Sequence, residues 1–272
     1  MKAVILAGGK GTRLAPYTKI LPKPLMPVGD MPILEIILRQ LERCGVCEAV
    51  LTVGHLADLL SAFFQDGKRF GMKIQYSFED RPLGTAGPLS LIQGLDETFF
   101  VMNGDVLTTL DFQDMIYYHR KYKAVATIAS HIRQVNIDFG VIQTNSGNEI
   151  TGYIEKPTYN FLVSMGVYTF EPCVLPYITY NKYLDFPDLV LRLIAAGERV
   201  LSYPYDGYWM DLGRVDDYEQ AVKDFSSIKS RILGEEASQT NKFTQLDNPT
   251  RERTALFDMM DGDEDGTTHS PV

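Results

Sequence analysis

The chain has 272 residues, enough for one large α/β domain or two small ones with a buried core. Its hydrophobic share of 45% and charged share of 22% are ordinary for a globular protein. A net charge of -9 without a basic stretch argues against nucleic acid as the main partner. No apolar run reaches the length of a membrane span and no cleavable signal pattern follows Met1, so we expect no membrane partner and a cytoplasmic location.

The first half of the chain alternates between short apolar runs and helical patterns. Strands of this length separated by helices predict an α/β fold with a doubly wound, mostly parallel sheet that binds ligands at the carboxyl ends of its strands. The predicted strands are Ala3–Ala7, Ala49–Val53, Lys73–Phe78 and Phe99–Met102. The predicted helices are Ile33–Leu41, Ala57–Phe64 and Ala86–Gln93.

After about residue 123 the pattern changes to shorter β-rich pieces. Their strands are predicted at Ala124–Ser130, Phe139–Gln143, Glu149–Ile154 and Ser164–Phe170, and helices return at Pro187–Ala195 and Asp216–Ile228. We interpret residues 1–232 as one domain, in which 1–123 bind a nucleotide and 124–232 form a smaller lobe that closes over it and recognises an acceptor. No hexapeptide repeat is present, so no β-helix domain is expected.

The last segment, residues 233–272, differs from the rest. From Glu235 onward nine acidic residues stand against three basic ones, a net charge of -6. Polar composition without periodicity predicts a disordered or lightly docked tail.

The most informative motif is the N-terminal run V-I-L-A-G-G-K-G-T-R, which ends at Arg13. A buried strand that leads into glycines presents bare backbone N–H groups and a guanidinium to a polyphosphate. The P-loop spacing does not fit, because no Gly-Lys-Ser/Thr follows the glycines. The dinucleotide-binding spacing does not fit either, because Leu14 stands where its third glycine belongs. A tight turn explains two adjacent glycines equally well.

A second cationic cluster favours the phosphate interpretation over the turn. Lys23 lies in the sequence L-P-K-P-L. Prolines on both sides restrict the backbone and hold one ammonium group at a fixed place.

Two carboxylates follow segments of the kind that end at a ligand site. Asp105 comes after a buried strand in F-F-V-M-N-G-D-V, and Asp211 lies in the aromatic turn G-Y-W-M-D-L-G. Alone, Asp105 is more typical of a helix cap or turn. Together, two carboxylates with phosphate oxygens and waters suit Mg²⁺.

Two further motifs present groups that suit a nucleotide and a sugar phosphate. In G-Y-I-E-K-P, the Glu155 carboxylate can accept hydrogen bonds from sugar hydroxyls, and the Lys156 ammonium can neutralise a phosphate, although a solvated strand end fits the pattern equally well. Gly84 and Thr85 precede a predicted helix and bring backbone groups close to a flat or anionic group.

A series of short motifs occurs in order along residues 1 to about 225. They are L-A-G-G-K-G-T-R-L, P-K-P-L, P-L-G-T-A-G, N-G-D, F-G-V, E-K-P, S-M-G-V-Y and G-Y-W-M-D-L-G. Through them the chain resembles the sugar-1-phosphate nucleotidyltransferases, and most closely their mannose-1-phosphate guanylyltransferase-like branch. This resemblance implies a Rossmann-like nucleotidyltransferase fold. It also implies that the phosphate of a sugar 1-phosphate attacks the α-phosphorus of a nucleoside triphosphate and releases pyrophosphate.

The resemblance also implies roles for individual residues. Arg13 and Lys23 are the expected catalytic residues, and Asp105 and Asp211 the expected Mg²⁺ ligands. The nucleotide-binding residues are expected to be Leu6, Ala7, Gly8, Gly9, Gly11, Thr12, Arg13, Glu79, Gly84 and Thr85. The sugar-phosphate-binding residues are expected to be Asn103, Gly104, Gly140, Glu155, Lys156, Ser164 and Gly166.

Base and sugar remain open at this stage. Glu79 favours GTP, because a carboxylate near the P-L-G-T-A-G loop can accept hydrogen bonds from guanine, and a mannose-like hexose 1-phosphate follows from the resemblance. Ser164 stands where many relatives carry Asn. The alternatives are uridylyl or thymidylyl transfer to glucose 1-phosphate and, in another class, a non-catalytic nucleotide-sugar sensor or regulatory subunit. A homo-oligomer is compatible with the sequence.

Overall fold

A computed structural model describes residues 1–234. These residues belong to one compact unit that runs from Met1 to Glu235. The predicted tail, residues 233–272, lies outside the described residues except for Leu233 and Gly234. No helix within residues 1–234 is long and apolar enough to cross a membrane.

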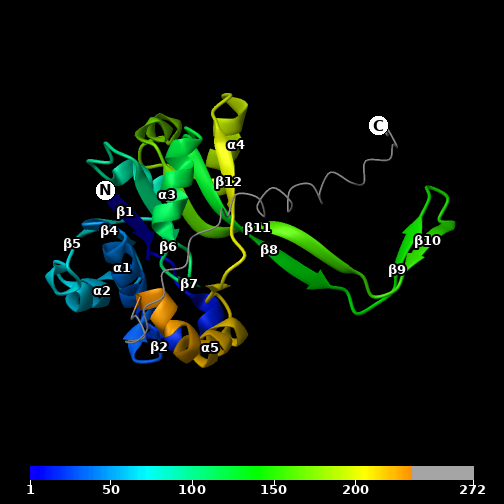
Figure 1. The fold of residues 1–272 in the computed structure, drawn as a ribbon, viewed down its shortest axis with the longest axis horizontal. Helices are drawn as coiled ribbons and strands as arrows, with labels where there is room; N and C mark the ends of the chain where they lie inside the picture. The colour runs from blue at the N-terminus through cyan, green and yellow to red at the C-terminus, as the bar shows by residue number, and fades with distance from the viewer. Residues whose placement is uncertain (235–272) are drawn as a thin grey trace, which may run out of the picture. The chain divides into compact units, whose positions relative to one another are not determined.

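A seven-stranded sheet forms the centre of the unit (Figure 1). Its strands in spatial order are β12 (Val200–Pro204), β8 (Ala126–Asn136), β11 (Thr158–Phe170), β6 (Phe99–Asn103), β1 (Lys2–Leu6), β4 (Glu48–Val53) and β5 (Lys73–Phe78). Neighbouring strands are parallel except in the two pairs that contain β11. The predicted α/β fold with a mostly parallel sheet is therefore confirmed.

Helices cover both faces of the sheet. They are α1 (Ile33–Arg43), α2 (Ala57–Phe64), α3 (Phe112–Lys121), α4 (Phe186–Ala195) and α5 (Val215–Leu233). Side chains of β1 alternate between two buried clusters: Ala3 and Ile5 pack with residues of α1, α2, α3 and α5, and Val4 packs with residues of α4. Both faces of the central strand are thus buried, which explains why the sequence of β1 is a continuous apolar run.

Three short two-stranded sheets complete the unit. They are β2 (Pro27–Val28) with β3 (Met31–Pro32), β7 (Val106–Thr108) with β13 (Trp209–Asp211), and β9 (Val141–Thr144) with β10 (Ile150–Ile154). Short 3₁₀ helices lie at η1 (Thr12–Leu14), η2 (Tyr17–Lys19), η3 (Lys23–Leu25), η4 (Lys68–Phe70), η5 (Gly87–Leu91) and η6 (Pro172–Tyr177).

One predicted helix needs correction, and one helix was missed. The helix predicted at Ala86–Gln93 is the 3₁₀ helix η5, which ends where Ile92 is extended. The amides of Ala86 and Gly87 donate to the Leu184 carbonyl oxygen, so contacts with a distant segment hold its beginning. The helix α3 was not predicted. Within residues 124–232, the strands β8, β11 and β12 extend the central sheet.

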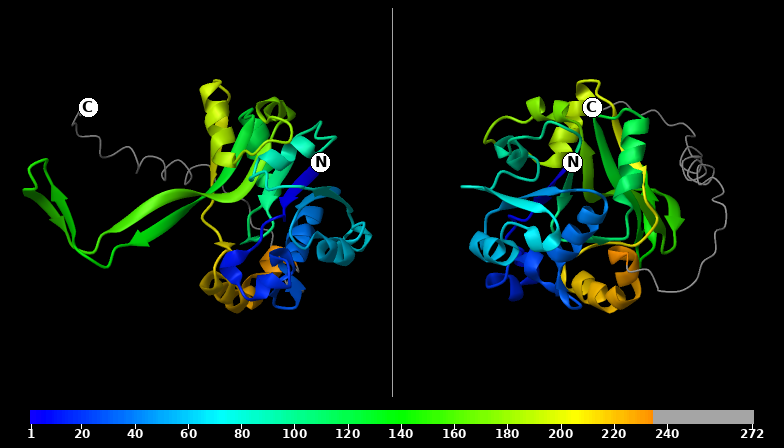
Figure 2. Two further views of the ribbon diagram at one scale, coloured as in Figure 1. Left: turned by 180° about the vertical axis from the view of Figure 1, so that it is seen from behind. Right: turned by 60° about the vertical axis from the view of Figure 1, so that its left-hand side comes forward.

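The strands β8 and β11 are much longer than predicted. They pair from Ala126 with Phe170 out to Asn136 with Thr158, with a register shift between Ser164 and Tyr168. Beyond the sheet they continue as a two-stranded ribbon that ends in the hairpin of β9 and β10 (Figures 1 and 2). We call residues 131–163 the arm.

Candidate active site

The site begins where β1 ends in the glycine loop. Gly11 adopts the left-handed conformation, with φ of 59°, and a Cβ there would lie 2.8 Å from Cγ2 of Thr18. The Thr18 hydroxyl in turn donates to the Gly11 carbonyl oxygen at 2.7 Å. At Gly9, by contrast, a Cβ would meet nothing within 4 Å. Gly11 is therefore needed for the shape of the loop, and Gly9 borders open space.

Lys23 joins this loop to both predicted metal-binding carboxylates. Its Nζ donates to Oδ2 of Asp105 and lies 3.9 Å from Oδ1 of Asp211. The Lys23 side chain is only 10% exposed, so its charge is held in place by its surroundings. Prolines flank it, as the sequence indicates, and Pro24 lies with it in η3.

A backbone pairing brings the two carboxylates together from distant parts of the chain. The strand β7 begins directly after Asp105 and pairs antiparallel with β13, which ends at Asp211. The amide of Leu212 also donates to the carbonyl oxygen of Asp105 at 3.0 Å. The predicted meeting of Asp105 and Asp211 is thus achieved by a two-stranded sheet.

The Asp211 carboxyl of this cluster has a raised pKa. Burial raises the pKa of Asp211, the negative charge of Asp105 raises it further, and Lys23 and Arg13 oppose both effects. Its Oδ1 is buried without a hydrogen-bond partner among the described residues. A Cβ at Gly213 would lie 3.0 Å from this oxygen and 3.2 Å from an Nη atom of Arg13, so the guanidinium borders the same spot. Arg13, Lys23, Asp105 and Asp211 therefore form one cluster.

Glu79 lies on the other side of the glycine loop. A Cβ at Gly8 would lie 3.2 Å from the Glu79 Oε1 atom and 3.5 Å from the amide nitrogen of Gly54. The Glu79 Oε2 atom accepts from the amide of Leu83 at 3.0 Å. Burial raises the pKa of Glu79, and the Leu83 hydrogen bond counteracts this in part. The structure thus brings Glu79 beside the predicted nucleotide-binding glycines.

Gly84 and Thr85 pack against the beginning of α4. The amide of Thr85 donates to the Asp185 carboxylate at 2.9 Å and its hydroxyl does so at 3.2 Å. The same hydroxyl accepts from the amide of Phe186 at 2.8 Å. Gly84, with φ of 78°, leaves no space for a Cβ against the Leu184 carbonyl oxygen. The Thr85 side chain therefore fixes this loop.

Four predicted sugar-binding residues gather where β6 and β11 meet the site. Gly104 donates to the Leu6 carbonyl oxygen at 2.9 Å. Gly166, with φ of 72°, packs directly on Asn103, since a Cβ there would lie 2.5 Å from the Asn103 amide nitrogen. Ser164 lies at the register shift of β11, where its hydroxyl donates to Tyr168 and accepts from the Gly166 amide.

The other three predicted sugar-binding residues lie on the arm. Gly140 packs against Tyr153, which lies on the strand β10 of the tip hairpin. Glu155 and Lys156 follow β10, and Lys156 has a left-handed φ of 45°. Among the contacts of residues 1–234, none joins these three residues to the cluster of Arg13, Lys23, Asp105 and Asp211. The structure therefore does not bring the whole predicted sugar site together.

Comparisons with known proteins show the family of the chain. Residues 2–227 match the sequence profile of the nucleotidyl transferase family. The chain belongs to the nucleotidyl transferase family. It is 37% identical over 243 residues to the UTP–glucose-1-phosphate uridylyltransferase of Synechocystis, an alignment that covers 82% of this chain and 63% of the relative. It is 35% identical over 227 residues to mannose-1-phosphate guanyltransferase beta-A of Xenopus laevis, covering 80% and 62%.

A solved structure of UDP-glucose pyrophosphorylase in complex with UDP-glucose has the same fold, with a TM-score of 0.63 and 22% identity. The match covers 83% of this chain and 98% of that one. The chain spans less than two thirds of the length of the two curated relatives.

Sequence reasoning missed three residues that shape this nucleotidyl transferase site. They are Thr18, which holds Gly11; Gly54, whose backbone lies against Gly8; and Asp185, which anchors Gly84 and Thr85. Asp185 directly precedes a helical pattern, as an N-terminal capping residue does, so its position was a usable signal. Nothing in the sequence indicates that Thr18 is turned back onto the glycine loop.

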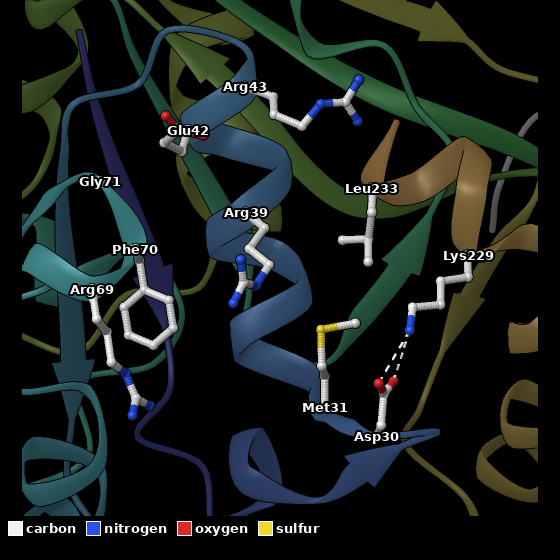
Figure 3. Close-up of a pocket in the computed structure, with 10 residues that line it drawn as sticks. All are labelled: Asp30, Met31, Arg39, Glu42, Arg43, Arg69, Phe70, Gly71, Lys229 and Leu233. Atoms are coloured by element: carbon white, nitrogen blue, oxygen red, sulfur yellow. Dashed lines mark hydrogen bonds and ion pairs between the residues drawn. The ribbon is translucent and has the colours of Figure 1, made fainter. Parts of the chain in front are cut away.

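A separate pocket of about 530 Å³ lies between α1, η4 and α5 (Figure 3). Its lining includes Arg39, Arg43, Arg69 and Lys229 but none of the predicted site residues. Lys229 pairs with Asp30 inside the pocket, as Figure 3 shows, at 3.0 Å. This pocket is thus distinct from the cluster around Lys23.

Proposed function

We propose that the chain transfers a nucleotidyl group from a nucleoside triphosphate to a sugar 1-phosphate, giving a nucleoside diphosphate sugar and pyrophosphate. The observation that carries this proposal is the cluster in which Lys23 contacts Asp105 and Asp211 beside a glycine loop. The relatives named uridylyltransferase and guanyltransferase support the same reaction class.

The proposed reaction needs charge neutralisation and alignment more than it needs a covalent residue. An oxygen of the sugar phosphate forms a bond to the α-phosphorus, and the bond from that phosphorus to the oxygen leading to the β-phosphate breaks. Lys23 and Arg13 neutralise the negative charge around this phosphorus. The backbone N–H groups from Gly8 to Thr12 hold the departing pyrophosphate, which leaves with the electrons of the broken bond.

Asp105 and Asp211 are the proposed ligands of Mg²⁺. The fit rests on two observations: Oδ1 of Asp211 is buried without a hydrogen-bond partner within residues 1–234, and the negative charge of Asp105 raises the pKa of Asp211. Phosphate oxygens and waters would complete the coordination shell of such a cation. When bound, Mg²⁺ supplies positive charge to the phosphates.

The proposed base is guanine, because the Glu79 carboxylate beside Gly8 can accept hydrogen bonds from its N1–H and N2–H groups. The proposed sugar is a mannose-like hexose 1-phosphate held by Asn103, Gly104, Ser164 and Gly166. Gly140, Glu155 and Lys156, which lie on the arm, belong to this proposal on the resemblance alone. Transfer of uridylyl or thymidylyl groups to glucose 1-phosphate is the alternative, supported by the Synechocystis relative.

Mass spectrometry of products tests the proposal. The protein and Mg²⁺ are incubated with each of the common nucleoside triphosphates paired with mannose or glucose 1-phosphate. We expect a nucleoside diphosphate sugar, with GTP and mannose 1-phosphate as the best pair. If the only products are glucose nucleotides made from UTP or dTTP, the proposed reaction stands, and the proposed guanine base and mannose-like sugar are wrong. Tight binding of a nucleotide sugar without product from any pair would favour the non-catalytic sensor.

A substitution at Glu79 tests the proposed base independently of the proposed reaction. Glu79→Gln replaces one acceptor oxygen by a donor, so kcat/KM for GTP is expected to fall by about tenfold or more while that for UTP changes little. Glu97→Gln, at an exposed position, is the matched control. An equal effect on both nucleotides would contradict the assignment of Glu79 to the base.

A further inference from the structure

The pocket between α1, η4 and α5 concentrates positive charge. Arg39 and Arg43 line it from α1, Arg69 from η4 and Lys229 from α5. Figure 3 shows these four side chains on three segments around the pocket. The lining contains two carboxylates, so its net charge is +2, whereas the whole chain carries -9. Such a local excess of positive charge attracts anions.

Two of the four cations are already paired with carboxylates. The guanidinium of Arg39 donates to Oε1 of Glu35 from its Nε atom at 2.9 Å and from an Nη atom at 2.6 Å. The ammonium of Lys229 donates to both carboxylate oxygens of Asp30, at 3.0 and 3.1 Å. These two charges are largely compensated, so the other two cations of the lining decide what the pocket attracts.

Arg43 is held in place without a carboxylate partner among residues 1–234. Its Nη1 atom donates to the carbonyl oxygen of Ile232 at 3.3 Å. Its guanidinium also lies directly on the backbone of Gly234 and leaves no space for a Cβ there. The neighbouring carboxylate of Glu42 lies against Gly71, since a Cβ at Gly71 would lie 3.2 Å from its Oε1 atom. The positive charge of Arg43 is therefore fixed at the pocket and not paired within the described chain.

Arg69 is likewise positioned by uncharged groups. Its guanidinium carbon lies 4.4 Å from the centroid of the Phe63 ring and 4.5 Å from that of Phe70. Stacking of this kind leaves the edge of a guanidinium, where its N–H groups point, available for acceptors. Within residues 1–234 Arg69 forms no ion pair with a carboxylate, although its neighbour Lys68 pairs with Asp66 at 2.8 Å. A second preorganised guanidinium therefore borders the pocket, and little entropy is lost when it binds an anion.

The charge and the size of the pocket indicate a phosphate-bearing ligand. The planar N–H forks of arginine match the oxygens of phosphate groups. One phosphate group carries about two negative charges at neutral pH, which matches the excess charge of the lining, whereas a carboxylate carries one. A volume of about 530 Å³ lies within the range of roughly 300–1,000 Å³ that holds small ligands. Met31 and Leu233 in the same lining offer an apolar contact to the uncharged part of such a ligand.

We propose that this pocket binds a small molecule that carries a phosphate group, held by Arg43 and Arg69. The site is separate from the cluster around Lys23 and does not depend on the proposed reaction. Inorganic phosphate, pyrophosphate and a sugar phosphate share the chemistry that it recognises.

Amide hydrogen exchange of the full chain, measured at rising ligand concentration, tests this proposal. Inorganic phosphate, pyrophosphate and glucose 6-phosphate are the probes, and sodium chloride at equal ionic strength is the reference. We expect at least one probe to slow exchange in residues 67–72 and 229–233 in a saturable way. The probe with the lowest half-saturating concentration distinguishes an inorganic anion from a phosphate ester. No protection beyond that of sodium chloride from any probe would overturn the proposal.

Substitutions test whether the two arginines hold the ligand. For Arg43→Gln and Arg69→Gln we expect the half-saturating concentration to rise at least about tenfold, because each variant loses a charged hydrogen-bond donor. Arg120→Gln, the same change at an exposed position of α3, is the matched control and should titrate like the wild type. Since the two arginines lie on different elements, a change of fold in one variant leaves the other as a test. Wild-type titrations in both variants would contradict the proposed site.

The Lys23→Ala variant keeps this test apart from that of the proposed reaction. Lys23 does not line the pocket, so Lys23→Ala should lose activity and keep the wild-type titration in residues 67–72 and 229–233. Loss of that protection in Lys23→Ala would show that the ligand acts from the site around Lys23, and the separate pocket would be wrong.

Discussion

Lys23 donates a hydrogen bond from its Nζ atom to the Asp105 carboxylate, although 82 residues separate the two. The contact joins the segment after the glycine loop to the end of β6, two neighbouring places at the carboxyl edge of the sheet. Since Asp211 lies 3.9 Å from the same ammonium group, the charge of Lys23 lies close to two carboxylates from different parts of the chain. This cluster is the proposed place of nucleotidyl transfer.

Removal of Lys23 should abolish most of the activity. Lys23→Ala deletes the charge that faces the reacting phosphates, and loss of one such group lowers kcat by about 100- to 1,000-fold. Lys19→Ala, at an exposed position of the same segment, should keep the wild-type rate. Steady-state pyrophosphate release measures both, and circular dichroism checks the fold. A wild-type rate in Lys23→Ala would show that the site is placed wrongly.

Removal of either carboxylate should weaken the response to Mg²⁺. For Asp105→Ala and Asp211→Ala we expect turnover lower by orders of magnitude and a higher Mg²⁺ concentration at half-maximal rate, because each loses one ligand. Isothermal titration with Mg²⁺ and a nucleoside triphosphate gives a readout besides activity. Asp206→Asn, an exposed carboxylate in the same segment as Asp211, is the control. Unchanged Mg²⁺ dependence in both variants would reject the proposed ligands.

Two neighbouring glycines should respond differently to the same substitution. In Gly11→Ala the new methyl group meets Thr18 at 2.8 Å in a left-handed backbone conformation, so we expect destabilisation by about 1–3 kcal/mol and a lower kcat. In Gly9→Ala the methyl group enters open space, and stability should change little. Urea unfolding measures both. Equal stability of the two variants would contradict the described loop.

The fold was largely predictable because its elements have strong local patterns. The helix Ala57–Phe64 and the strand Lys73–Phe78 have the predicted bounds. The helix α3 was missed although Asp111 caps it and accepts hydrogen bonds from the Gln113 and Asp114 amides. The predicted α-helix at Ala86–Gln93 was wrong, since the segment forms a 3₁₀ helix. Its first amides donate to the Leu184 carbonyl oxygen, a contact between distant segments that a local pattern does not reveal.

The candidate site was predictable to a smaller extent. The sequence predicted that Asp105 and Asp211 share one site. The contact of Lys23 with both carboxylates was not predicted, and the pairing of β7 with β13 depends on contacts between distant segments. The arm could not be foreseen. Alternation of apolar and polar residues predicts a strand with one apolar face, and it does not tell whether the same chain covers that face.

The buried His119 should make stability depend on pH. Burial lowers the pKa of His119 below its ordinary value of 6.5, and the nearby Glu171 carboxylate only partly offsets this. The imidazole of His119 therefore binds a proton more tightly in the unfolded chain than in the folded one. The free energy of unfolding contributed by His119 is complete above pH 6.5 and is lost as the pH falls toward the pKa of the folded state.

Substitution of His119 isolates this effect. The free energy of unfolding of the wild type, measured with urea at several pH values, should fall more steeply below pH 6.5 than that of His119→Gln. His55→Gln, at an exposed position, should keep the wild-type slope. Parallel curves for the wild type and His119→Gln would contradict the described environment of His119.

Pyrophosphate release by the wild-type chain tests the central claim most directly. The rate is measured with Mg²⁺ and a nucleoside triphosphate alone, with a sugar 1-phosphate alone, and with both together. We expect release only with both substrates and in equal amount to the nucleoside diphosphate sugar that forms. No release from any pair of substrates, or release that does not need the sugar phosphate, would contradict the assignment of the Lys23 cluster to nucleotidyl transfer.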